Sequence, residues 1–111
     1  MHATSNPTPA IQAKFFALGE PVRLAIVTRL ADGPRTAGEL AEPFEISRPA
    51  VSRHLRVLRE AGIARAEVRG REWWYTLEPQ NLDAIEEYIE ELKAMWRTAL
   101  GSLKDYVENQ A

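Results

Sequence analysis

Hydrophobic side chains recur every three or four residues along several segments of the chain, which is the spacing of one face of an α-helix. The pattern predicts helices over residues 10–18 and 21–32, separated near Gly19 and ended by Gly33. Residues 1–9 are rich in Thr, Ser, Asn and Pro and lack this pattern, so they are expected to form a disordered tail.

A short third helix is expected to begin at Thr36, because Thr36 and Glu39 have the spacing of a capping box. Pro43 disfavours helical backbone at the residue before it and therefore ends this helix. The turn that follows is expected to insert Phe44 and Ile46 into the core.

A fourth helix is predicted from Ser47 to about residue 61, because Ser47 is a favourable N-cap and Pro49 falls in the first turn, where no backbone donor is missed. Val51, Leu55 and Leu58 fall on one side of this helix and are expected in the core. Its opposite side is polar and faces outward.

Residues 63–77 alternate in side-chain character on both sides of Gly70, which predicts two antiparallel strands joined by a glycine turn. Asn81 is expected to cap a long final helix over residues 82–107. The element order is that of a helix-turn-helix followed by a β-hairpin wing. The expected fold is therefore mainly α with a small β-hairpin (α+β), in one domain over residues 10–109.

The predicted final helix carries eight hydrophobic positions spaced alternately three and four residues apart, which is the heptad pattern of a helix-helix seam. They are Leu82, Ile85, Ile89, Leu92, Trp96, Ala99, Leu103 and Tyr106. An intramolecular core would cover some of these positions but hardly all, so the remainder is expected to pack against a second copy. The candidate homodimer contacts are Phe15, Phe16, Ile85, Ile89, Leu92, Trp96, Ala99 and Leu103.

Charge is unevenly distributed along the 111 residues, although the formal net charge is only −2. Residues 48–71 hold seven arginines and two glutamates, whereas residues 78–111 hold eight acidic side chains and three basic ones. This polarity suits a protein that presents one face to a polyanion.

The basic residues gather on the outer face of the fourth helix and at the hairpin. Arginine binds guanine bidentately in the major groove of DNA, although an exposed charged helix face is also common in proteins that bind nothing there. Arginines at the hairpin tip favour DNA, because they would reach a neighbouring phosphate or the minor groove. His54 is expected to pack with one backbone or phosphate hydrogen bond. The candidate DNA contacts are Thr36, Ser47, Arg48, Pro49, Ser52, Arg53, His54, Arg56, Arg69, Gly70 and Arg71.

The segments TAGELAEPFEISRPAVSRHLRVLREAGI and RGREWWYTL resemble the ArsR-type family of bacterial winged-helix repressors, and the resemblance covers residues 15–103. It implies that the helix over residues 47–60 reads double-stranded DNA, that the hairpin is the wing, and that the terminal helices form a homodimer. Glu45 departs from the family pattern, because many relatives have glycine in this turn; a left-handed backbone would be unfavourable there.

Many relatives sense metals through cysteines on the third helix or histidines on the last, but this chain has no cysteine and its last helix has no histidine. No cofactor, metal response or enzymatic activity is therefore expected, and an inducer, if one exists, is an unknown small molecule. No segment resembles a secretory signal or a membrane span, so a cytoplasmic location is expected. The expected function is a dimeric repressor that occludes a pseudo-palindromic operator; the alternative is a winged-helix adaptor for protein or RNA.

Overall fold

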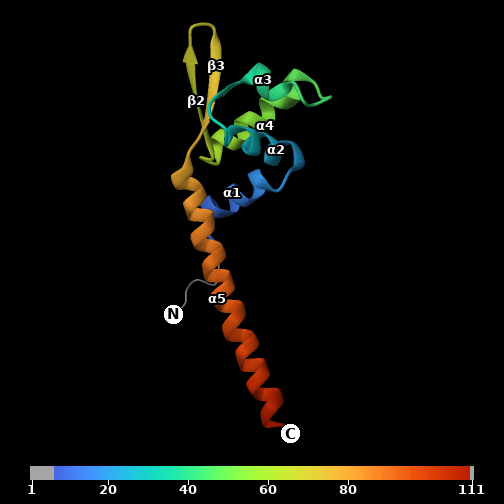
Figure 1. The fold of residues 1–111 in the computed structure, drawn as a ribbon, viewed down its shortest axis with the longest axis vertical. Helices are drawn as coiled ribbons and strands as arrows, with labels where there is room; N and C mark the ends of the chain where they lie inside the picture. The colour runs from blue at the N-terminus through green and yellow to red at the C-terminus, as the bar shows by residue number, and fades with distance from the viewer. Residues whose placement is uncertain (1–6, 111) are drawn as a thin grey trace.

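The computed structural model describes residues 7–110. Its elements are α1 (Pro9–Leu18), α2 (Pro21–Leu30), β1 (Arg35–Thr36), α3 (Ala37–Ala41), α4 (Arg48–Glu60), β2 (Ala64–Arg69), β3 (Glu72–Leu77) and α5 (Pro79–Asn109). Helices α1 to α4 form a compact group; the β2–β3 hairpin projects from one end and most of α5 extends away at the other (Figure 1). The predicted fold class, a mainly helical winged helix-turn-helix, is confirmed.

Two predicted helix starts need correction. Helix α1 begins at Pro9, one residue before the predicted start, and Thr8 of the expected tail caps it by accepting a hydrogen bond from the Ile11 amide at 3.2 Å. Residues 1–6 of that tail lie outside the described part of the chain. Helix α5 begins at Pro79, so Asn81 lies inside it and does not cap it. Instead, the Asn81 side-chain amide donates to the Gly62 carbonyl and joins α5 to the residues that follow α4.

The sheet contains a strand that the sequence pattern did not reveal. Strand β1 pairs with β3, so the antiparallel order is β1-β3-β2, with Thr36 opposite Trp74. Arg69 lies opposite Glu72 around Gly70, whose φ of +66° is the left-handed backbone expected of a tight glycine turn. The predicted hairpin is thus confirmed, and β1 links the middle of β3 to the start of α3.

The core lies where α2, α3 and α4 meet the sheet, and its largest fully buried side chains are those of Ile26, Leu40, Leu55, Leu58 and Ile63. Phe44 packs against this core, but Ile46 is 39% exposed, so its predicted burial was wrong. The turn before α4 runs over the surface and turns only one of its two apolar side chains inward. No non-glycine residue within positions 7–110 has positive φ, so Glu45 is not left-handed.

Candidate nucleic-acid interface

The outer face of α4 is an exposed surface on a well-fixed helix. The Ser47 hydroxyl accepts a hydrogen bond from the Ala50 amide at 3.2 Å, as predicted, which defines where the helix begins. Val51, Leu55 and Leu58 are buried beneath it. The side chains on the other face are exposed, and these are Arg48, Pro49, Ser52, Arg53, Arg56, Arg59 and Glu60.

The arginines of this face are free to meet an external partner. Within residues 7–110, neither Arg48, Arg53 nor Arg56 forms an ion pair with a carboxylate. A hollow of about 110 Å³ lies beside them between α3 and α4, lined by Ala37, Gly38, Ala41, Arg48, Val51, Ser52 and Leu55. Helix α4 therefore presents its first turns openly, next to a shallow recess.

Thr36 supports this surface from within. The predicted capping box is present: the Thr36 hydroxyl accepts from the Glu39 amide at 3.1 Å, and the Glu39 carboxylate accepts from the Thr36 amide at 2.9 Å. That amide hydrogen bond holds the pKa of Glu39 below its usual value. Thr36 is only 9% exposed, so its hydroxyl orders α3 and does not lie with the exposed α4 arginines.

The two arginines at the wing tip differ in their surroundings. The Arg69 guanidinium donates to the Glu67 carboxylate at 2.6 Å and lies 5.3 Å from the centre of the Trp74 ring. This hydrogen bond holds the pKa of Glu67 below its usual value. Arg71 is exposed and, in the described part of the chain, has no carboxylate partner. Arg71 is thus the cation that the wing offers outward.

Two further arginines, Arg59 near the end of α4 and Arg65 on β2, were not among the predicted contacts. The Arg59 guanidinium lies 5.8 Å from the centre of the Trp73 ring, and Arg65 pairs with Glu78 at 2.8 Å. An open hollow of about 530 Å³ is lined by Arg56, Arg59, Glu60, Ala64, Arg65 and Ala66. The signal for Arg59 was its position three residues after Arg56, which continues the basic side of the helix.

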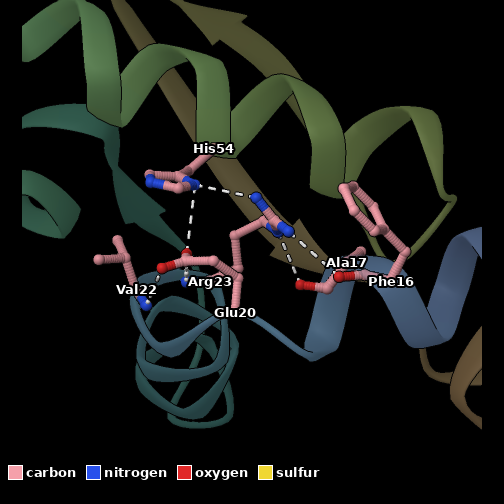
Figure 2. Close-up of polar contacts among 6 residues, drawn as sticks. All are labelled: Phe16, Ala17, Glu20, Val22, Arg23 and His54. Carbon is pink, nitrogen blue, oxygen red and sulfur yellow. Dashed lines mark hydrogen bonds and ion pairs between the residues drawn. The ribbon is translucent and has the colours of Figure 1, made fainter.

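His54 points its Nδ1 atom toward α2 and not toward solvent (Figure 2). This atom lies 3.1 Å from Nη1 of Arg23 and 3.3 Å from Oε2 of Glu20. The predicted packing of His54 is confirmed, but its Nδ1 partners are side chains, not the expected backbone or phosphate group.

Arg23 is a buried cation, 6% exposed, that sequence analysis missed. It donates from Nε to the Ala17 carbonyl at 2.7 Å and from Nη2 to the Phe16 carbonyl at 3.1 Å. The available signal was its position three residues before Ile26 on the inward stripe of α2.

Glu20 caps α2 next to this cation, and its carboxylate accepts from the amides of Val22 and Arg23, each at 3.1 Å. Desolvation opposes the charged form of Glu20, but the two amide hydrogen bonds and the neighbouring His54 and Arg23 outweigh it and hold the pKa of Glu20 below its usual value. A charged Glu20 thus lies beside the Arg23–His54 contact.

The predicted dimer contacts divide into covered and exposed groups. Ile85 is 8% exposed, and Phe15 packs edge-to-face on Tyr88 with ring centres 5.7 Å apart. Leu92 is half-buried, and Ala99 is exposed. Phe15 is nevertheless 36% exposed, and the other large predicted contacts that are exposed are Phe16, Ile89, Trp96 and Leu103, as is Tyr106 of the seam. The seam on α5 is therefore mostly bare beyond its first turns.

Comparisons with known proteins agree with this architecture. The sequence profile of a helix-turn-helix domain matches residues 18–67, from the last residue of α1 into β2. The HTH-type transcriptional regulator Rv2034 of Mycobacterium tuberculosis (strain ATCC 25618 / H37Rv) is 38% identical over 94 residues, covering 85% of each chain. The crystal structure of an ArsR family transcriptional regulator, RHA00566, has a TM-score of 0.77 and 30% identity, covering 83% of this chain and 95% of that one. This chain belongs to the ArsR-type family.

As an ArsR-type protein, the chain is a DNA-binding transcriptional regulator and not an enzyme. A further relative, the transcriptional repressor SdpR of Bacillus subtilis (strain 168), is 38% identical over 63 residues, 57% of this chain and 70% of its own length. Within residues 7–110 of this ArsR-type regulator, no three His, Cys, Asp or Glu side chains are grouped so that they could hold a metal ion. None of its described helices is long and apolar enough to cross a membrane.

Proposed function

We propose that the chain is a homodimeric repressor that occludes a promoter by binding a pseudo-palindromic operator. The observation that carries this proposal is the outer face of α4, where Ser52, Arg53 and Arg56 are exposed on a helix whose start is fixed by Ser47. Side chains on the first turns of such a helix reach base edges when it enters the major groove. The name of the related repressor SdpR supports repression as the outcome.

Base recognition is assigned to α4, and binding of phosphate or the minor groove is assigned to the wing. Arg53 and Ser52 read bases, with Arg48, Pro49 and Arg56 beside them, while Arg71 holds phosphate or the minor groove. The remaining predicted contacts act indirectly: Ser47 and Thr36 cap helices, Gly70 forms the turn, and Arg69 and His54 bind neighbouring side chains. The hollow lined by Arg59 and Arg65 extends the basic surface along the DNA backbone.

The dimer in this proposal forms through α1 and the bare seam of α5. Trp96 and Leu103 are 63% and 58% exposed, which is unusual for large apolar side chains that recur along one helix face. A second copy of the same seam would cover both. Two α4 helices would then face successive major grooves about one helical turn apart.

The proposed regulator does not respond to metal. Its third helix has no cysteine, its last helix has no histidine, and thiolate and imidazole are the ligands that soft and borderline metals prefer. Operator affinity, measured by fluorescence anisotropy, is expected to be unchanged by zinc, cadmium, arsenite or a chelator. A stoichiometric shift with any of them would contradict this part of the proposal.

The experiment that tests the proposal begins with selection of bound sites from random DNA, followed by affinity measurements on two variants. Arg53→Ala is expected to cost about 1–3 kcal/mol for each half-site and to relax the preference at one base position of each half-site. Arg71→Ala is expected to weaken operator and random duplex alike, and to lower the slope of log affinity against log salt by about one for each phosphate that Arg71 neutralises in the wild type.

Lys104→Ala, at the far end of α5, is the matched control for removal of one surface cation and leaves the operator-to-random ratio unchanged. If Arg53→Ala leaves that ratio unchanged while Arg71→Ala abolishes it, then Arg71 recognises the base and Arg53 contributes only non-specific affinity. Equal affinity of the wild type for operator and random duplex would instead favour the adaptor function.

A further inference from the structure

Three polar side chains join the C-terminal end of α1, the start of α2 and the middle of α4 (Figure 2). They are Glu20, Arg23 and His54, and the shortest side-chain contact among them runs from Arg23 Nη1 to His54 Nδ1 at 3.1 Å. In the proposed function none of these three side chains contacts DNA. It lies between the surface proposed for dimerisation and the surface proposed for DNA.

The two neighbours of His54 Nδ1 differ in their hydrogen-bonding character. The Arg23 guanidinium, 3.1 Å away, only donates hydrogen bonds, whereas the Glu20 carboxylate, 3.3 Å away, accepts them, so Nδ1 is the atom through which His54 joins both groups. The other Arg23 bonds end on the carbonyls of Phe16 and Ala17, at the negative C-terminal end of α1. One buried guanidinium therefore holds the end of α1 and a side chain of α4 together.

The same guanidinium also contacts the α1 surface. Its central carbon lies 5.0 Å from the centre of the Phe16 ring, within the range of a cation–π interaction, and Phe16 is 68% exposed. A molecule packed against the Phe16 ring would therefore be linked to α4 through a single residue, Arg23, which contacts both Phe16 and His54. Phe15, the neighbouring aromatic, instead packs on Tyr88 of α5.

We propose that Arg23 and His54 are positioning residues that fix α4 to α1, so that a second copy packed on Phe16 sets the orientation of α4 on DNA. This inference rests on the proposed function, in which α4 reads DNA and α1 lies in the dimer. His54 acts on DNA binding through its Nδ1 and Arg23, and not by touching DNA.

Two substitutions of His54 separate this role from a direct DNA contact. His54→Asn places its amide near the position of Nδ1, within reach of Arg23 and Glu20, whereas His54→Gln carries its amide farther out, near the position of Nε2. His54→Asn is expected to keep operator affinity within about twofold of wild type, and His54→Gln to lose about tenfold. Thermal unfolding checks that both variants are folded. Rescue by Gln and not Asn, or equal affinities of the two variants, would overturn the proposal.

A double-mutant cycle tests the connection to Phe16. Phe16→Leu keeps an apolar side chain but removes the ring, and is expected to lower operator affinity several-fold in the wild type and much less in His54→Gln. Phe15→Leu is the matched control and is expected to be additive with His54→Gln. All affinities are measured with the protein fully dimeric, as established by sedimentation.

Failure of the proposed function and failure of the positioning role give different results. A wild-type protein that is monomeric or does not bind DNA overturns the proposed function and this inference with it. A dimer that binds its operator, but whose Phe16 and His54 effects add independently, overturns this inference alone.

Discussion

Helices α4 and α5 carry apolar stripes of similar spacing, yet the two stripes are covered very differently. On α4, Leu55 and Leu58 are 2% and 0% exposed, whereas on α5 Trp96 and Leu103 are 63% and 58% exposed. Periodicity identifies which side chains share a helix face. It does not identify what covers that face, because this depends on segments elsewhere in the chain or in another molecule.

The neighbours of the two helices explain the difference. Helix α4 is contacted by α1, α2, α3 and β2, while α5 packs chiefly against α1 and then runs outward (Figure 1). The contribution of the α4 stripe to stability is therefore intramolecular and independent of protein concentration. The α5 stripe is expected to contribute through association, which strengthens with concentration.

The largest expected effect comes from shortening a matched leucine on each stripe. Leu55→Ala leaves a cavity in a closed core and is expected to lower the free energy of unfolding by about 2–5 kcal/mol. Leu103→Ala should cost much less at low protein concentration and more as the concentration rises. Urea unfolding at two protein concentrations measures both. Similar losses that do not depend on concentration would remove the distinction between the stripes.

The next effect concerns association alone. Trp96→Glu places a charge in the middle of the bare seam and is expected to weaken dimerisation by about 2–4 kcal/mol, because a large aromatic near the centre of an interface carries much of its energy. Sedimentation equilibrium gives the dissociation constant. Glu91→Gln, on the acidic side of the same helix, is the control and should leave it nearly unchanged. A wild type that is monomeric at micromolar concentration would contradict the dimer.

The smallest expected effect compares two serines. Ser47→Ala removes the side-chain cap of α4 and is expected to destabilise the protein by about 1 kcal/mol. Ser102→Ala, on the exposed part of α5, removes no cap and should change stability by only a few tenths of a kcal/mol, because alanine is the better helix former. Thermal unfolding of the two variants makes the comparison. Equal losses would mean that the Ser47 hydroxyl is not acting as a cap.

The features predicted correctly depend on residues close together in the sequence. The Ser47 cap, the Thr36–Glu39 capping box and the Gly70 turn each involve at most four consecutive residues, so their geometry follows from local chemistry. The exposed arginines of α4 follow from the same helical spacing as its buried leucines. This is why the fold class and the outer face of α4 were accessible without a structure.

The features that were missed depend on residues far apart. Asn81 resembles a helix cap, but its amide reaches the carbonyl of Gly62, and β1 exists only because Thr36 meets Trp74 across the sheet. Arg23 is buried because carbonyls of α1 and a histidine of α4 surround it, and arginine is rarely buried without such partners. No local pattern specifies these contacts.

The position of β2 has a consequence for how these molecules behave when crowded. It is an edge strand of the sheet, and a bare strand edge can template the addition of a strand from another molecule. Arg65, Glu67 and Arg69 stand at every second position along β2 and are all exposed. Charged side chains at such an edge disfavour pairing of the β2 strands of two wings into a continuous sheet. The charged edge of the wing is therefore expected to disfavour edge-to-edge pairing while the wing projects into solvent.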